Sequence, residues 1–196
     1  MSYNAFAEFY DGLTGNVEYK DRAEYIEKLI KSFGREAGTT LDLACGTGSL
    51  TLELYRRGFD IFGVDASIDM LSEAQQKCSE DEQILFICQK MQRLNLASEI
   101  DTCICTLDSI NHLTNPKDVK ETFKRVAKYL SKDGLFIFDV NTLYKHREVL
   151  CDNCFVFDTD EVFCSWQNEL DKETDIVNIT PVSYTHLRAH ETDQYL

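Results

Sequence analysis

Residues 40–48, Thr-Leu-Asp-Leu-Ala-Cys-Gly-Thr-Gly, form a glycine-rich segment that could bind a nucleotide-like ligand. A short apolar run ends in this segment, and a stretch with helical character follows it at once. Glycine suits such a turn because it tolerates positive φ and lets a ligand approach the bare backbone. The pattern predicts the first strand–turn–helix unit of a nucleotide-binding α/β sheet.

Asp65 is a second residue with recognisable chemistry, because it follows another apolar run and lies 19 residues after Gly46. An acidic residue about 20 residues after the glycine turn can bind an adenosine ribose. One carboxylate can accept from both ribose hydroxyls, and each hydrogen bond to a charged group contributes about 1.5–3 kcal/mol. The alternative is that Asp65 caps the helix predicted to begin at Ser67. We favour ribose binding because of the glycine turn upstream.

The glycine motif also indicates which adenosine cofactor fits. A dinucleotide site requires a third glycine, and Thr51 stands at that position. Asp42 offers an acceptor for an amino group two residues before Ala44, and Gly46 and Gly48 follow on the same edge. Free N–H groups at the start of the next helix can bind a carboxylate. The motif therefore favours S-adenosylmethionine, which has no pyrophosphate, over NAD.

Hydrophobic periodicity predicts strands that alternate with helices, an order typical of a parallel sheet with right-handed crossovers. We expect a Rossmann-like, doubly wound α/β fold with a mostly parallel sheet and helices on both faces. Ser67 is predicted to cap its helix. The predicted strands are residues 41–44, 60–64, 84–88, 102–106 and 135–140, and the predicted helices are residues 3–13, 18–33, 49–57, 67–79 and 116–130.

The carboxyl ends of parallel strands meet at one edge, where ligands bind. Besides the residues already named, this edge is expected to carry Gln89, Met91, Leu107, Asp108, Asp139 and Asn141. Asp108, His112 and Asp139 are candidates for removing a proton, and we select Asp108 and Asn141 as facing the substrate or cofactor. His112 could instead be an ordinary surface residue, and Asp139 could accept from a neighbouring loop amide.

After Asn141 the pattern changes to short β-like runs at residues 154–157, 161–167 and 175–179, which predict a partial antiparallel cap. We expect one domain over residues 1–180, with N-terminal helices at 3–34, a core at 40–141 and the cap at 142–180. Residues 182–192 resemble a translated sequencing adapter, so residues 181–196 are predicted to be a non-native tail. The closing strands of the sheet would then be missing, and the open edge of strand five predicts low stability or solubility.

Several segments together resemble the class I S-adenosylmethionine-dependent methyltransferases. They are residues 42–48, Gly-Val-Asp-Ala-Ser at 63–67 and Phe-Ile-Phe-Asp-Val-Asn at 136–141. Residues 6–13 (Phe-Ala-Glu-Phe-Tyr-Asp-Gly-Leu) and 107–111 (Leu-Asp-Ser-Ile-Asn) are similar to a subgroup of small proteins in that family. The resemblance spans about residues 3–180 and implies cofactor contacts at Tyr10, Ala44, Gly46, Asp65, Met70, Met91 and Leu107.

Lys90 departs from this family pattern, because similar proteins place an aspartate there to accept from the adenine amino group. A lysine has no acceptor. Gln89 could supply a carbonyl oxygen instead, and the Met91 backbone can still bind adenine. We expect cofactor binding to persist, in weakened form.

Composition sets further limits on function. The chain has 196 residues, 43% of them hydrophobic, and a net charge of -14, which disfavours a nucleic-acid substrate. No apolar run is long enough to span a membrane and no signal peptide precedes the domain, so we expect a cytosolic protein.

The eight cysteines are predicted to be thiols in a reducing compartment. Four of them lie in apolar runs, where cysteine behaves as a small hydrophobe. They are Cys45, Cys88, Cys103 and Cys105. The Cys-x-x-Cys pair at 151–154 has no second pair or histidine at ligand spacing, so we predict no metal site.

The preferred hypothesis is methyl transfer from S-adenosylmethionine to a small-molecule acceptor. The alternatives are a non-catalytic module that binds the cofactor or a partner, and an RNA-modifying methyltransferase. Neither the acceptor nor the oligomeric state follows from the residues.

Overall fold

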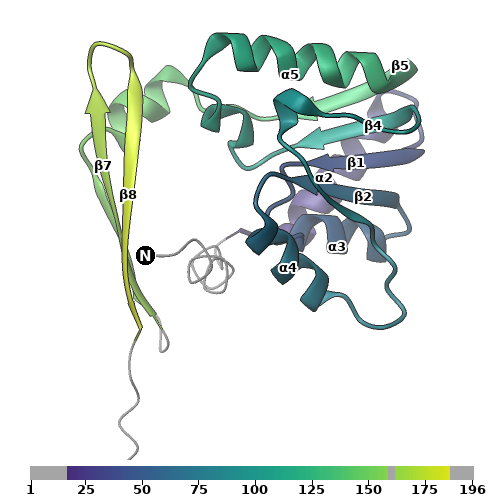
Figure 1. The fold of residues 1–196 in the computed structure, drawn as a ribbon, viewed down its shortest axis with the longest axis horizontal. Coiled ribbons are helices and arrows are strands. Elements are labelled where there is room, and N and C mark those ends of the chain that lie inside the picture. The colour runs from purple at the N-terminus through teal and green to yellow at the C-terminus, as the bar shows by residue number, and fades with distance from the viewer. Residues whose placement is uncertain (1–16, 159–161, 186–196) are drawn as a thin grey trace, which may run out of the picture. The chain divides into compact units, whose positions relative to one another are not determined.

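A computed structural model describes residues 17–158 and 162–185 of the chain (Figure 1). The chain forms two compact units that divide between Asn141 and Thr142. The predicted helix at residues 3–13, which contains Tyr10, lies outside the described residues. None of the described helices combines the length and the apolar character that crossing a membrane requires.

The first unit contains a five-stranded parallel sheet with the order β3-β2-β1-β4-β5. Neighbouring β1 and β4 lead the chain toward opposite edges, so the topological switch point lies between them (Figure 1). The predicted doubly wound fold is confirmed. The strands are β1 Thr39–Leu43, β2 Asp60–Asp65, β3 Phe86–Cys88, β4 Ile100–Cys105 and β5 Leu130–Phe138.

The helices of this unit begin at residues that satisfy their free N–H groups. The Ser67 side chain accepts from the Met70 N–H at 3.3 Å, which confirms the predicted cap of α4. Asn115 likewise caps α5 by accepting from the Lys117 N–H at 3.0 Å. The helices are α2 Tyr19–Ser32, α3 Ser49–Arg56, α4 Ile68–Lys77 and α5 Pro116–Tyr129, with single 3-10 turns η1 Met91–Arg93 and η2 Ser109–His112.

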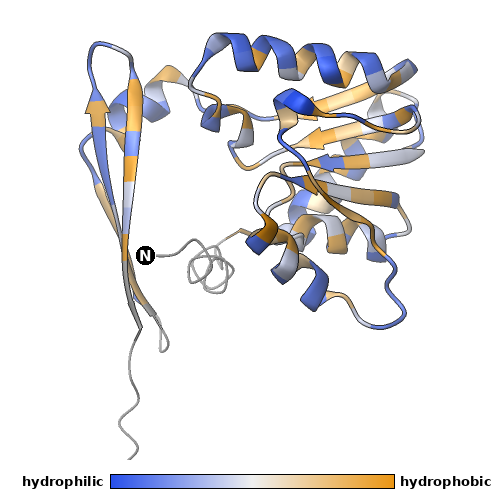
Figure 2. Cartoon of the chain, viewed as in Figure 1, coloured by the Kyte–Doolittle hydropathy of each residue, from blue (hydrophilic) through white to orange (hydrophobic). Residues whose placement is uncertain are grey.

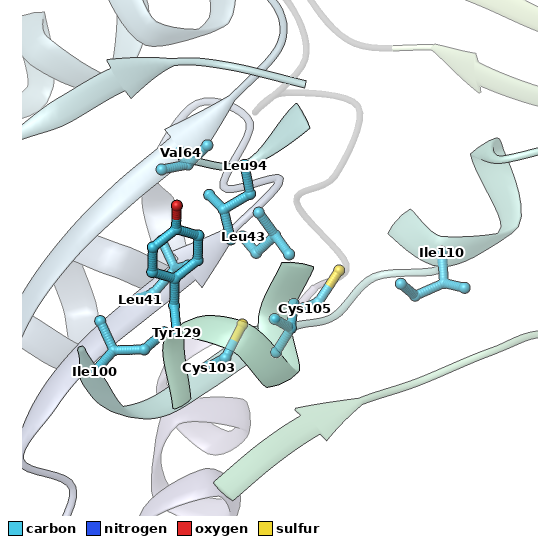
Figure 3. Packing of buried hydrophobic residues seen from close by; sticks show 10 residues of the cluster. Leu41, Leu43, Val64, Leu94, Ile100, Cys103, Cys105, Ile110 and Tyr129 are labelled. Atoms are coloured by element: carbon cyan, nitrogen blue, oxygen red, sulfur yellow. The ribbon is translucent and has the colours of Figure 1, made fainter. Parts of the chain in front are cut away.

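Two hydrophobic clusters cover the two faces of the sheet. Leu41 and Leu43 of β1 pack with Tyr129 of α5 on one face (Figure 3). Ile104 of β4 points the other way and packs with Ile26 of α2. This alternation arises because successive strand residues face opposite sides, and each fully buried side chain contributes about 1.5–3 kcal/mol. Much of β4 and β5 is orange in Figure 2, whereas α5 is largely blue.

All eight cysteines are free thiols. Cys103 and Cys105 of β4 are buried in the core, as expected for small hydrophobes. Cys88 lies on the predicted strand, at the end of β3, but it is exposed and does not pack as a core hydrophobe. It lies on a strand at the edge of the sheet, where fewer neighbours cover it.

Strand β5 begins earlier than the sequence predicts and contains an irregularity. Its pairing with β4 passes from Ile100–Leu130 directly to Thr102–Leu135, so residues 131–134 bulge out of the ladder. Asp133 lies in this bulge and has a positive φ of 71°. In the described part of the chain β5 pairs with β4 alone and forms one edge of the sheet.

The second unit is antiparallel, as the sequence pattern predicts. Its sheet has the order β6-β7-β8, with strands Cys154–Asp158, Val162–Asp171 and Ile176–Thr185, preceded by a π-helical turn η3 at Lys145–Leu150. Strand β8 runs past the predicted end at residue 179 and includes Pro181, opposite Trp166. Proline is tolerated there because β8 is an edge strand of the three.

Glycine is required at residue 48 for packing as well as for conformation. Its φ is +71°, and an added Cβ would lie 2.8 Å from the Ala74 Cβ and 3.1 Å from the Phe86 ring. Gly58 has a φ of +89° but no atom within 4 Å of such a Cβ. A substitution at Gly58 therefore reports the cost of conformational strain without a steric clash.

We expect Gly58→Ala to lower the free energy of unfolding by about 1–2 kcal/mol through strain. Gly48→Ala should lower the free energy of unfolding by about 1–3 kcal/mol more than Gly58→Ala, because the added methyl overpacks the contact with α4 and β3. Urea unfolding of both variants measures the difference. Equal losses would contradict the packing role of Gly48.

Candidate active site

A cavity of about 620 Å³ lies at the carboxyl ends of β1, β2, β3 and β4. Its size is typical of small-molecule sites. Eight residues that the sequence predicts to bind a cofactor line it together, although they come from distant parts of the chain. They are Asp42, Ala44, Gly46, Asp65, Met70, Gln89, Met91 and Leu107.

The glycine turn is bound to the neighbouring strand β2. The N–H groups of Ala44 and Cys45 both donate to the Val64 carbonyl, at 2.7 and 3.1 Å. Ala44 and Gly46 have φ values of 62° and 55°, in the left-handed region. A Cβ on Gly46 would meet no atom within 4 Å, so this backbone borders open space that a ligand can occupy.

Both oxygens of Asp65 accept backbone hydrogen bonds. The Gly46 N–H donates to Oδ2 at 2.9 Å, and the Ser67 N–H donates to Oδ1 at 2.8 Å. The bond from Ser67 shows that Asp65 also accepts a hydrogen bond just before α4, which is close to the alternative role considered for it. A carboxylate retains further lone pairs for a ribose hydroxyl, so the two roles are compatible. Ribose binding itself stays a prediction.

Asp42 is buried beneath the turn, with 3% of its surface exposed. Thr51, the residue in place of the third glycine, donates its hydroxyl to Asp42 Oδ2 at 2.6 Å. Burial raises the pKa of Asp42 to about 6, the Thr51 hydrogen bond opposes this rise, and the nearby Asp65 charge adds to it. Thr51 therefore holds the Asp42 carboxylate by a hydrogen bond, a role that the sequence motif did not indicate.

Gln89 is committed to the loop that follows β3. Its side-chain oxygen accepts from the Asn95 N–H at 2.8 Å, and its side-chain nitrogen donates to the Asn95 carbonyl at 3.1 Å. The carbonyl oxygen expected for adenine thus already has one donor. Lys90 is exposed and does not line the cavity, whereas the adjacent Met91 does.

Three predicted site residues are placed outside the cavity lining: Gly48, Asp108 and Asn141. Gly48 instead packs against α4 and β3. The Asn141 N–H donates to the Asn111 side chain at 2.8 Å. Asp139 accepts from the N–H groups of Leu107 and Asp108, which is the structural alternative weighed for it.

Comparison with known proteins agrees with this geometry. Residues 40–134 match a family model described as a methyltransferase domain. The chain is 37% identical over 169 residues to YqeM of Bacillus subtilis strain 168, a protein named as a methyltransferase. This alignment covers 86% of this chain and 67% of YqeM. A solved S-adenosylmethionine-dependent methyltransferase from Clostridium acetobutylicum ATCC 824 is 34% identical, with a TM-score of 0.79, covering 95% of this chain and 80% of that chain.

The chain belongs to the class I S-adenosylmethionine-dependent methyltransferases. The methyltransferase also resembles a glycine/sarcosine N-methyltransferase of Aphanothece halophytica, at 30% identity over 138 residues, 68% of this chain and 51% of that protein.

The residues of the methyltransferase fit S-adenosylmethionine, its cofactor. The cavity is lined by three carboxylates, Asp42, Asp65 and Asp69, and by no lysine or arginine among the residues that the structure describes. This charge suits a ligand that carries a sulfonium and an ammonium group. Ser49 and Leu50 at the start of α3 also line the cavity, and a helix N-terminus favours an anionic group such as a carboxylate.

Sequence reasoning missed several residues that line the cavity of the methyltransferase. Thr106 and Ser109 flank Leu107, and the Ser109 hydroxyl donates to the Thr106 carbonyl at 2.7 Å. Their position just after β4, at the binding edge of the sheet, could have indicated that they line the site. Tyr19, at the start of α2, also lines the cavity, as does Cys45, whose thiol pKa burial raises well above its usual value. The raised pKa favours the neutral thiol form of Cys45.

Asp42 should make the stability of the methyltransferase depend on pH. Its pKa rises from an ordinary 3.8 to about 6 on folding, so the folded state holds the proton more tightly than the unfolded state. The corresponding stabilisation, about 3 kcal/mol, is present below pH 4 and is lost as the pH rises through 6.

Asp42→Asn removes this titration and retains an acceptor for Thr51. We expect the variant to gain about 3 kcal/mol of unfolding free energy relative to the wild type between pH 4 and pH 7, because the remaining carboxylates are common to both. Urea unfolding across this range provides the measurement. Parallel pH profiles of the two proteins would show that Asp42 titrates normally.

Proposed function

We propose that this methyltransferase transfers the methyl group of S-adenosylmethionine to a small-molecule acceptor. The observation that carries the proposal is the cavity of about 620 Å³, lined by three carboxylates and by no described cationic side chain. A phosphate backbone would meet repulsion both there and from the net charge of -14. The similarity to a glycine/sarcosine N-methyltransferase supports an acceptor of small size.

Catalysis on this proposal rests mainly on positioning. S-adenosylmethionine supplies a methyl group that its sulfonium already activates, so no covalent intermediate with the protein is required. Asp65 and Gly46 form one fixed hydrogen-bonded unit that orients a bound ribose. Correct orientation of two reactants can supply a large part of the rate enhancement.

His112 is the best-placed proton acceptor. It lies at the end of η2 and lines the cavity, whereas Asp108 at the start of the same turn does not. An amine or hydroxyl acceptor must lose a proton during transfer, and a neutral imidazole can accept it. We therefore propose His112 in this role, ahead of the Asp108 that the sequence favoured.

Calorimetric titration with S-adenosylmethionine tests the cofactor site. We expect binding by the wild type and an affinity about 10- to 100-fold lower for Asp65→Asn, because a hydrogen bond to the charged carboxylate is lost and the Gly46 N–H is less well held. Asp60→Asn is a matched control at the opposite end of β2, where Asp60 accepts from the Thr39 hydroxyl at 3.0 Å.

The control should bind within about twofold of wild type, since it leaves the cavity unchanged. A folded wild-type protein that binds no S-adenosylmethionine would overturn the proposed function.

Release of S-adenosylhomocysteine tests the acceptor. We expect release with pooled small metabolites and none with total RNA. For the acceptor found in this way, His112→Gln should lower kcat about 100-fold without changing the affinity for S-adenosylmethionine, because proton transfer contributes a factor of this order.

Two outcomes would contradict this account. Release with RNA alone would favour the RNA-modifying alternative, and cofactor binding without any release would favour a non-catalytic module. A larger loss of kcat in Asp108→Asn than in His112→Gln would return the proton-accepting role to Asp108.

A further inference from the structure

The loop after β4 has an unusual backbone conformation at two successive residues. Leu107 and Asp108 both have a φ of 60°, in the left-handed region that residues with side chains rarely adopt. Non-glycine residues persist in such conformations only where their surroundings hold them. The loop therefore needs an acceptor to hold it.

Asp139, which follows β5, supplies that acceptor. The Leu107 N–H donates to its Oδ2 at 3.0 Å, and the Asp108 N–H donates to its Oδ1 at 2.8 Å. These are charge-assisted hydrogen bonds, which are stronger than neutral ones. The Arg22 guanidinium also lies 3.2 Å from Oδ2, but both side chains are about one-third exposed, so this ion pair contributes less.

The loop that Asp139 holds forms a wall of the cofactor cavity. Leu107 lines the cavity, and so do its neighbours Thr106 and Ser109, whereas Asp139 does not. A second bond, from the Asn141 N–H to Asn111 at 2.8 Å, joins the same two strand exits. The exit of β5 thus acts as a scaffold for the exit of β4.

We propose that Asp139 is a positioning residue that keeps the Leu107–Asp108 loop in its left-handed conformation and thereby maintains the cavity for S-adenosylmethionine. The inference rests on the proposed function for its ligand. Asp139 does not line the cavity, so this role replaces the proton-accepting role considered for it from the sequence.

Asp139→Asn tests the proposal, because an asparagine keeps the size of the side chain but has only one acceptor oxygen. In the free protein, we expect the Leu107 and Asp108 amides to exchange with solvent at least 10-fold faster, as measured by NMR. By calorimetry, the Kd for S-adenosylmethionine should rise about 10- to 30-fold.

Asp101→Asn is the matched control. Asp101 also joins neighbouring strands, because it accepts from the Thr39 N–H at 3.0 Å and from the Ser131 hydroxyl at 2.8 Å. These contacts lie at the opposite ends of the strands, away from the cavity. The control should destabilise the fold while its Kd for S-adenosylmethionine stays within about twofold of wild type.

A second substitution separates positioning from general stability. Adding Asp108→Gly to Asp139→Asn should recover at least threefold in affinity, because glycine adopts positive φ without strain. A wild-type Kd in Asp139→Asn, or an equal loss in Asp101→Asn, would overturn the proposal. If the wild type binds no S-adenosylmethionine, the proposed function fails. Unchanged amide exchange at Leu107 and Asp108 in Asp139→Asn would independently show that Asp139 does not hold the loop.

Discussion

The Asp65 carboxylate is the interaction on which the site depends. It accepts from the Gly46 N–H at 2.9 Å and from the Ser67 N–H at 2.8 Å, so it joins the glycine turn to the exit of β2 and the start of α4. A parallel sheet brings these segments to one edge, and a single anion then fixes their relative position. Without it the left-handed backbone at Gly46 would lack its acceptor.

The same arrangement recurs across the switch point at the exits of β4 and β5, where Asp139 holds Leu107 and Asp108. In each case a carboxylate at the exit of one strand accepts from at least one N–H group of the loop that follows the neighbouring strand. Loops in rarely populated conformations persist only when their surroundings determine them, and such strain is common around ligand sites. The cavity is therefore shaped before a ligand enters, which lowers the ordering cost of binding.

The alternation of apolar runs was sufficient to predict the parallel sheet, because burial on both faces leaves a clear pattern. It also placed Asp65 correctly at the end of β2. Features that depend on distant neighbours were not predictable: Gly48 packs against Ala74 and Phe86, which its own segment does not reveal. Similarly, leucine does not signal a left-handed conformation, so the strain at Leu107 was not predictable from the sequence.

Thr51 stands where a dinucleotide site has its third glycine, and its side chain contacts a buried carboxylate. A third glycine would permit closer packing of the helix against the strand, whereas the Thr51 hydroxyl donates to Asp42 at 2.6 Å and favours its charged form. Burial raises the pKa of Asp42 to about 6, so ionising Asp42 at neutral pH carries a desolvation cost. A bound cation offsets that cost, so ionisation of Asp42 and binding of a positively charged cofactor favour each other.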